Sequence, residues 1–323
     1  MRTVARDDVI DKTKGILIFF VVFGHFLERY AGWDDEASGF FLRSIYLFHM
    51  PAFIFISGMF FKAENWKNSF SRYFAIFIVF QILYIIFDLL ISGGGSFEKW
   101  VNRPYWIMWF MFTLSIYCLI TPILMQYKQA MIASIILSVY IGLVSTDNYP
   151  YSIGRTLSFL PFFIAGALYG KELCNVVRAK KITLLLSPFI LTVICFASYF
   201  VEINPKWLFG VSNINDFGHN YIYAIFIKLC LLVISFLAVI SLIRVSVFLP
   251  DFLKALGNNS LSIYLFHGFI ILLVAQFIEF TQSGYVLVLV CFAASIATCM
   301  ILKEHVFSSI IANLTKPVSK VFK

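Results

Sequence analysis

The dominant pattern along the chain is a series of long apolar runs separated by short polar segments. A helix needs ~20 mostly apolar residues to cross ~30 Å of hydrocarbon, and ten runs reach or approach that length. They lie near residues 14–30, 40–61, 70–92, 105–125, 129–146, 154–171, 182–202, 219–243, 259–280 and 284–302. The segments between them are too short to hold a soluble domain. We therefore predict an all-α fold, a polytopic membrane helix bundle of about ten transmembrane helices.

Positive charge divides unequally between the two sides of these spans. With the N-terminus in the cytoplasm, the cytoplasmic segments hold 18 of the 25 Lys and Arg residues and the opposite side holds six, while Lys228 lies within a span. Because Lys and Arg concentrate on the cytoplasmic side of membrane proteins, both termini are predicted to be cytoplasmic. We expect one membrane domain over residues 1–302, followed by a basic cytoplasmic tail over 303–323 that lies along the inner face.

The composition supports a membrane protein and excludes other classes. Hydrophobic residues make up 61% of the 323 residues and charged residues 13%, whereas soluble domains carry about 25% charged residues. The six Cys lie mostly inside apolar runs and never as CxxC, which indicates buried hydrophobic residues rather than a redox site. Outside the apolar runs, no basic stripe with interleaved aromatic residues points to nucleic acid.

Ionisable residues inside an apolar helix are energetically costly, so each one is a candidate for a functional site. Lys14 and His25 are eleven residues apart, which places them within ~20° on one helix face and ~16 Å apart along the axis. Asp11 lies one turn before Lys14 on the same side. A neutral imidazole accepts a proton from a hydroxyl near neutral pH, so His25 is the candidate base, although a single His in an apolar helix is more often a packing residue.

The segment Ser-Ile-Tyr-Leu-Phe-His occurs twice, at residues 44–49 and 262–267. The flanking residues do not continue the match, so it does not indicate a structural repeat. Neither histidine has a carboxylate or Cys at ligand spacing, and no metal site is predicted. Arg155 begins the sixth run and Lys228 lies inside the eighth. Each either touches substrate or has a structural role, Arg155 at the membrane boundary and Lys228 as a paired group within the bundle.

Four segments, in order along the chain, resemble signatures of the acyltransferase 3 family of integral membrane acyltransferases. They are Arg6-x4-Asp11-x2-Lys14-Gly15 with Gly24-His25, then 48–60, 154–166 and 256–267. The Lys-Gly pair is similar to the fucose 4-O-acetylase-like branch. The resemblance implies a ten-helix enzyme that transfers an acyl group, usually acetyl from acetyl-CoA, to a carbohydrate hydroxyl. It also implies that the histidine closing an Arg-x10-His motif is required for catalysis. Here that residue is His25, with Lys14 in the place of the arginine.

On this basis we expect His25 and Asp11 to be catalytic. Asp11 would act by holding Lys14 or Arg6 in place. The cytoplasmic cations Arg6, Lys14 and Arg72 are expected to bind the phosphates of CoA, although positive-inside topology alone accounts for most such charges. The polar residues of the later motifs are the candidates for substrate binding: His49, Ser57, Arg155, Tyr264 and His267.

We therefore expect an O-acyltransferase of the bacterial plasma membrane that acetylates a cell-surface polysaccharide or its lipid-linked precursor. The expected partners are acyl-CoA, the carbohydrate acceptor and membrane lipid, with no metal and no nucleic acid. Many longer relatives carry an extracytoplasmic hydrolase-like domain, so either a separate extracytoplasmic transferase completes the reaction or the bundle does so alone. The alternative is a transporter of a glycan or small solute with His25, His49 and His267 as a proton relay. The lack of half-to-half symmetry disfavours it.

Overall fold

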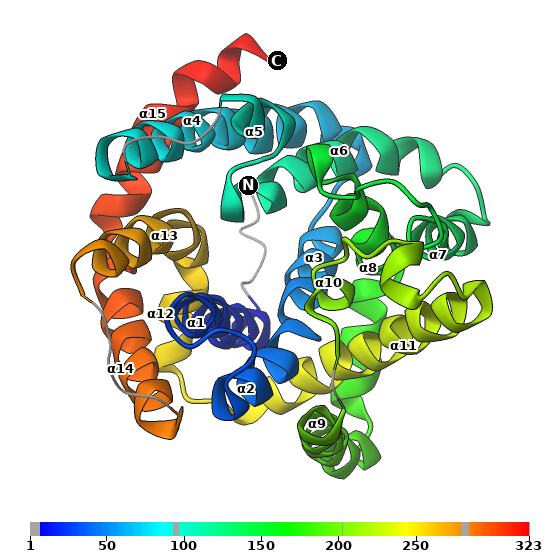
Figure 1. Ribbon diagram of the computed structural model, residues 1–323. Coiled ribbons are helices and arrows are strands. Elements are labelled where there is room, and N and C mark those ends of the chain that lie inside the picture. The colour runs from blue at the N-terminus through cyan, green and yellow to red at the C-terminus, as the bar shows by residue number, and fades with distance from the viewer. Residues whose placement is uncertain (1–6, 93–96, 202, 279–283, 323) are drawn as a thin grey trace. The chain divides into compact units, whose positions relative to one another are not determined.

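The computed structural model describes residues 7–92, 97–201, 203–278 and 284–322, and helices dominate it (Figure 1). The α-helices are α1 (Asp8–Tyr30), α2 (Glu36–Tyr46), α3 (His49–Met59), α4 (Trp66–Ser92), α5 (Phe97–Asn102), α6 (Trp109–Leu124), α7 (Ala130–Tyr140), α8 (Ile153–Ala179), α9 (Ile182–Phe200), α10 (Pro205–Leu208), α11 (Tyr221–Val245), α12 (Phe252–Asn258), α13 (Ser260–Phe277), α14 (Gly284–Leu302) and α15 (His305–Val321). The described residues contain no β-strand. The predicted all-α fold is confirmed.

Eight helical stretches in the described part of the chain are long and apolar enough to cross a membrane. The two other predicted spans correspond to α1 and α7. Helix α1 has 23 residues but carries charged side chains near both ends. Helix α7 has only 11 residues, which is about 16 Å and roughly half of the hydrocarbon thickness. The chain is thus a multi-pass membrane protein, and the number of ten is reached only when these two helices are included.

The chain divides into two compact units. Unit 1 contains residues 1–49, 172–200 and 237–308, and unit 2 contains residues 50–171, 201–236 and 309–323. In unit 1, α1 packs against α2, α12, α13 and α14, which lie around it in Figure 1. The first helix of the chain is therefore the centre of its unit.

The two ends of α1 are set by its flanking residues. Asp7 caps the first turn, where its carboxylate accepts hydrogen bonds from the backbone N–H groups of Val9 and Ile10. After Tyr30 the chain turns away at Gly32, which has a φ of +74° that glycine adopts without steric cost. Between these two ends α1 is one continuous helix, so its polar residues have fixed positions along a single axis.

Helices α1 and α12 touch through two glycines, one on each helix. A Cβ atom on Gly15 would overlap the carbonyl oxygen of Leu253, and one on Gly257 would overlap the carbonyl oxygen of Asp11. Small residues of this kind let two backbones approach closely inside a membrane. The same device joins α3 to α8 in unit 2, where Gly58 and Gly166 each lie against a backbone carbonyl of the other helix.

The span predicted at 40–61 is two helices, because α2 ends at Tyr46 and α3 begins at His49. Pro51 explains the break. Proline has no backbone N–H, and its ring clashes with the carbonyl group four residues earlier, which here belongs to Leu47. The helix is therefore interrupted at Leu47 and Phe48, just after the residue whose side chain reaches His25.

Candidate functional site

A set of hydrogen-bonded polar side chains surrounds His25 in unit 1. Nδ1 of His25 lies 3.3 Å from Oε2 of Glu28, one turn later on α1. The hydroxyl of Tyr46, at the end of α2, donates to the same Oε2 at 2.8 Å and lies 3.2 Å from Nδ1 of His25. These side chains are largely buried, with 14% of His25, 28% of Glu28 and 7% of Tyr46 exposed. Three polar groups from two helices thus satisfy one another in an apolar environment.

This arrangement selects one tautomer of the His25 ring. A carboxylate only accepts hydrogen bonds, so the nitrogen that faces Glu28 must carry the proton. The proton of the Tyr46 hydroxyl is directed to Glu28, which leaves the oxygen of Tyr46 as a second acceptor for Nδ1–H. In the neutral imidazole the lone pair then belongs to Nε2. A carboxylate that holds Nδ1–H in this way makes Nε2 a base of defined orientation.

The other two candidate histidines also lie beside this site. The ring of His267 stacks on the ring of His25, with centroids 5.4 Å apart and planes 20° apart. The ring of His49 lies 4.7 Å from the ring of Tyr46. Both histidines are buried and donate Nδ1–H to main-chain carbonyl groups, His49 to Ile45 and His267 within its own helix. The structure thus brings His25, His49 and His267 together, and Tyr264 lies next to His267 with ring centroids 6.1 Å apart.

The close approach of Tyr46 to α1 depends on Gly24. A Cβ atom at Gly24 would lie 3.0 Å from the Tyr46 ring, tighter than ordinary contact. Trp33 completes the surroundings: its Nε1–H points to Oε1 of Glu28 at 3.5 Å, and its ring meets the Tyr46 ring at 5.1 Å. Both carboxylate oxygens of Glu28 are therefore engaged.

Asp11 and Lys14 lie at the other end of α1. Asp11 is about 21 Å from His25 along the helix axis, because fourteen residues separate them. Its carboxylate forms an ion pair with Nζ of Lys14 at 2.6 Å, and it is buried while Lys14 is partly exposed. This is the contact predicted from their spacing. Arg6, the third residue expected there, lies outside the described residues.

Ion pairs between α1 and the Asp251 turn surround that end of the helix. Lys12 lies 2.8 Å from Asp251, and Lys254 lies 2.7 Å from Asp8. The hydrogen bond from Lys12, with a second one from Lys254, holds the pKa of Asp251 below its usual value. These pairs reinforce the backbone contact between α1 and α12.

The remaining candidates belong to unit 2. Ser57 donates to the carbonyl of Phe53 one turn earlier in α3, and Arg72 is exposed on α4. Arg155 lies over the rings of Trp109 and Tyr149. Lys228 is buried in α11 and donates to the hydroxyl of Ser158 at 3.1 Å. Among the described residues, no three His, Cys, Asp or Glu side chains are grouped so that they could hold a metal ion.

Two residues of the site, Glu28 and Tyr46, were not among the candidates. Glu28 could have been found from the sequence, because residues three apart on a helix share a face and His25-x2-Glu28 has that spacing. Tyr46 could not, because its approach to His25 depends on the packing of α2 against α1. The hexapeptide in which it lies gave no indication of which of its six residues faces the site.

Comparison with known proteins agrees with this architecture. The family model of acyltransferase 3, described as an acyltransferase domain, matches residues 7–304. Nodulation protein NolL of Sinorhizobium fredii (strain NBRC 101917 / NGR234) is 25% identical over 222 residues, which are 60% of this chain and 58% of that protein. Nodulation protein NolL of Mesorhizobium japonicum (strain LMG 29417 / CECT 9101 / MAFF 303099) is 41% identical over 69 residues, 21% of this chain and 18% of that protein.

The chain thus aligns with little more than half the length of the first of these relatives. No solved structure matches it. The family model covers much more of this chain than the relatives do. Its match extends from the cap of α1 almost to the start of α15 and includes every helix that forms the His25 site. The chain therefore belongs to the acyltransferase 3 family.

Proposed function

We propose that this protein is an O-acetyltransferase of the bacterial plasma membrane. It transfers the acetyl group of acetyl-CoA to a hydroxyl of a cell-surface polysaccharide or its lipid-linked precursor. The observation that carries the proposal is the contact of Nδ1 of His25 with Glu28 and Tyr46, which leaves Nε2 as an oriented base. Membership of the acyltransferase 3 family supports the class of reaction.

In the proposed reaction, Nε2 of His25 removes the proton from the acceptor hydroxyl as its oxygen attacks the thioester carbonyl. The tetrahedral intermediate collapses with cleavage of the C–S bond. The proton on Nε2 passes to the departing CoA thiolate, so His25 returns to its neutral form. During the first step the imidazole becomes a cation, and the carboxylate of Glu28 stabilises that charge at 3.3 Å.

His25 has a second route open to it, in which it carries the acetyl group itself. In that route Nε2 attacks the thioester carbonyl and CoA leaves as the thiolate. The acceptor hydroxyl then attacks the acetyl group, the C–N bond to the ring breaks, and the hydroxyl proton passes to the CoA thiolate. Both routes need Nδ1–H held by Glu28. The buried His267 ring, stacked on His25, excludes water from one face of the imidazole and so protects either intermediate from hydrolysis.

The donor is expected at the cytoplasmic face, where CoA phosphates would meet basic side chains. Lys14 supports this role because it is partly exposed and its ammonium has three N–H donors, of which Asp11 needs one. Arg72 is exposed and available for the same purpose, and Arg6 remains a proposal of the same kind. We propose His49, Ser57, Arg155, Tyr264 and His267 as residues that contact or shape the acceptor.

The test is the pair of variants His25→Gln and Glu28→Gln, assayed for ester formation on surface glycan and in purified protein. His25→Gln should abolish transfer, because an amide neither accepts a proton near pH 7 nor carries an acyl group. Glu28→Gln should lower kcat by at least about 100-fold with little change in KM, since Glu28 acts by positioning and stabilising His25. The exposed His219→Gln and Glu64→Gln are matched controls that should leave transfer unchanged.

Substantial transfer by His25→Gln would contradict the proposal. Equal melting temperatures of the variants and the parent protein keep the test separate from folding. A transporter with a histidine relay predicts a different result: a deletion strain would show unchanged acetate release from its glycan on mild saponification, with altered glycan export. Loss of acetate release with normal export supports the acetyltransferase.

A further inference from the structure

Arg178, in the last turn of α8, has one edge of its guanidinium group unpaired inside unit 1. Its Nη1 lies 2.7 Å from Oδ2 of Asp7, the residue that caps α1. Its Nε and Nη2 are buried, and no group among the described residues accepts a hydrogen bond from either atom. A buried N–H group without an acceptor is unfavourable. This edge is therefore suited to an acceptor that the described residues do not supply.

The geometry of the unpaired edge selects the kind of acceptor. The N–H bonds of Nε and Nη2 point in parallel from one edge of the guanidinium plane, and such a fork binds two oxygen atoms of one carboxylate or phosphate. The pairing of Nη1 with Asp7 holds the fork in a fixed orientation. Lys180 and Lys181 follow closely and are exposed. Positive charge of this density favours a phosphate monoester, which carries about 1.5 to 2 negative charges near pH 7.

The turn after Arg178 is fixed by contacts with the end of α11. The hydroxyl of Thr183 lies 2.5 Å from the carbonyl oxygen of Val177 and 2.6 Å from that of Lys180. It also accepts a hydrogen bond at 3.1 Å from Nε of Arg244, which is buried. These bonds tie the end of α8 to α9 and α11 within unit 1. Arg178 and the two lysines are therefore presented from a rigid turn.

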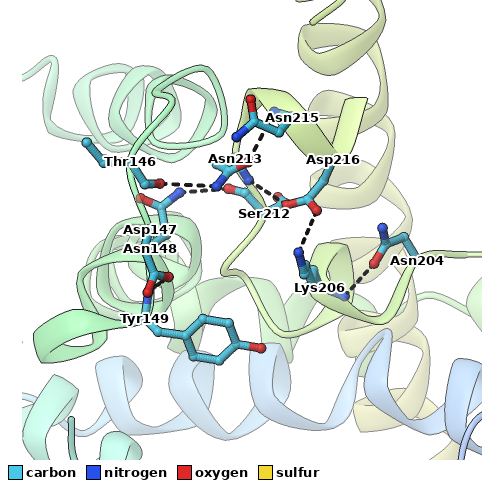
Figure 2. A network of polar contacts seen from close by, with 10 residues as sticks. All are labelled: Thr146, Asp147, Asn148, Tyr149, Asn204, Lys206, Ser212, Asn213, Asn215 and Asp216. Carbon is cyan, nitrogen blue, oxygen red and sulfur yellow. Dashed lines mark hydrogen bonds and ion pairs between the residues drawn. The ribbon is translucent and has the colours of Figure 1, made fainter. Parts of the chain in front are cut away.

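A polar network in unit 2 provides a contrast (Figure 2). There Lys206 lies 2.8 Å from Oδ1 of Asp216, much as Arg178 lies beside Asp7, but 49% of the Lys206 side chain is exposed. Its other N–H groups can therefore reach water. An ion pair that joins two parts of the chain thus does not require the remaining donors of its cation to be buried. Pairing with Asp7 alone does not explain the buried fork of Arg178.

Asp7, Lys14 and His25 occupy one face of α1. Asp7 and His25 are eighteen residues apart, which is about five helical turns and about 27 Å along the axis. Lys14 lies between them, about 16 Å from His25 and within ~20° of the same face. Positive groups thus lie at two distances from the candidate base: Lys14 itself, and Arg178 beside Asp7.

These two distances match the spacing of the phosphates in CoA. In an extended chain three bonds span about 3.3–3.6 Å, as they do along a polypeptide. About twenty bonds separate the sulfur from the 3′-phosphate, which gives about 23 Å, and about fourteen separate it from the diphosphate, which gives about 16 Å. With the thioester at His25, the diphosphate reaches Lys14. The 3′-phosphate reaches Arg178, because the side chains at the two ends cover the remaining distance.

From this match we propose that the fork of Arg178 binds the 3′-phosphate of the acyl donor CoA, and that the face of α1 sets the distance from that phosphate to His25. The proposal rests on the proposed function, because that function supplies CoA as the donor. The fork takes two of the three terminal oxygen atoms of the phosphate. Lys14 keeps its role at the diphosphate.

The test measures binding of CoA and of 3′-dephospho-CoA, neither of which carries an acyl group, so it does not depend on catalysis. Purified protein in nanodiscs of zwitterionic lipid is titrated with each compound by isothermal titration calorimetry. The parent protein should bind CoA at least about tenfold more tightly than 3′-dephospho-CoA, the size expected for one charge-assisted pair. Arg178→Gln should remove that preference by weakening the binding of CoA alone.

Three further variants sharpen the test. Lys14→Gln should weaken the binding of both compounds by the same factor, because both carry the diphosphate. Lys206→Gln breaks an ion pair of similar length in unit 2 and should change neither affinity. Arg178→Lys keeps the charge beside Asp7 without the fork, so it should retain only part of the preference for CoA. This last variant decides the test if Arg178→Gln does not fold.

Equal weakening of CoA and 3′-dephospho-CoA in Arg178→Gln, or a preference for CoA that both Arg178 variants keep in full, would overturn the inference. A parent protein that binds the two compounds equally, but is stabilised by phosphatidylglycerol through Arg178, would make this a lipid headgroup site instead. Acetyl transfer by a protein without a preference for CoA would refute this inference alone. An Arg178-dependent preference in a protein that never transfers acetyl would refute the proposed function alone.

Discussion

The two copies of Ser-Ile-Tyr-Leu-Phe-His show how one short sequence serves one site in two ways. The second copy is helical throughout and the first is helical except at Leu47 and Phe48, all residues but Phe266 are buried, and in both the histidine donates Nδ1–H to the carbonyl of the isoleucine four residues earlier. Both also reach the surroundings of His25. The first copy presents its tyrosine, whose hydroxyl bonds to Glu28, whereas the second presents its histidine, which stacks on His25.

The difference lies in the residue two positions after each hexapeptide. It is Pro51 after the first copy and Phe269 after the second. Pro51 interrupts the helix between Tyr46 and His49, while α13 continues through its copy to Phe277. The local hydrogen bond is thus a property of the hexapeptide, whereas the next residues along the chain determine which of its side chains serves the site.

Transferring the proline from one copy to the other should have the largest effect. Phe269→Pro should destabilise the protein by about 3 kcal/mol or more relative to Phe269→Ala, because it removes a hydrogen bond from α13 and clashes with the carbonyl of Leu265. The matched alanine variant accounts for loss of the ring. Thermal unfolding in detergent measures both, and equal melting temperatures of the two variants would refute the role given to the proline.

Substitution of the tyrosines of the two copies should have an effect of intermediate size. Tyr46→Phe removes the hydroxyl that bonds to Glu28 and should lower kcat by about tenfold, the effect of losing one hydrogen bond to a charged group. Tyr264→Phe, at a residue proposed to shape the acceptor site, should act mainly on KM for the acceptor and change kcat by less than about twofold. Both variants keep the ring and should melt like the parent protein. If initial rates of acetyl transfer fell equally in both, the assignment of Tyr46 would be wrong.

The smallest effect should come from the turn that leads into the second copy. Lys12 and Lys254 lower the pKa of Asp251, so the ionised carboxylate is stabilised in the folded state. Its contribution is therefore present at neutral pH and is lost as pH falls through that lowered pKa. Asp251→Asn should lower the melting temperature by only about 1 °C at pH 7, because the Asp251 carboxylate is largely exposed to solvent. The difference should disappear once the pH is below that lowered pKa, and a difference that persists there would contradict this account.

The sequence predicts the membrane fold because apolar runs have a length that the bilayer sets. It also predicts the Asp11–Lys14 pair, which depends on spacing within a single helix. The lengths of the apolar runs do not predict that α7 is short or that the run at 40–61 is broken between α2 and α3. Pro51, which explains that break, can nevertheless be seen in the sequence. The partners of His25 on other helices, Tyr46 and His267, require knowledge of how helices that are distant in sequence pack together. The contact of Glu28 with His25 differs from these, because the two residues are three apart on one helix and their spacing alone indicates it.

The close contact between α1 and α12 at Gly15 and Gly257 has a consequence for biosynthesis. Helix α1 is made first, but the helix that covers its glycine is completed roughly 240 residues later, which takes about 12–50 s at ordinary rates of translation. During that interval the helix face with Asp11, Lys14 and His25 lacks its final neighbours. The polar side chains of the nascent helix therefore need a temporary binding partner, either in the insertion machinery or among the lipid headgroups. Site-specific crosslinking from Gly15 in stalled chains should capture that host before residue 257 is synthesised and α12 afterwards.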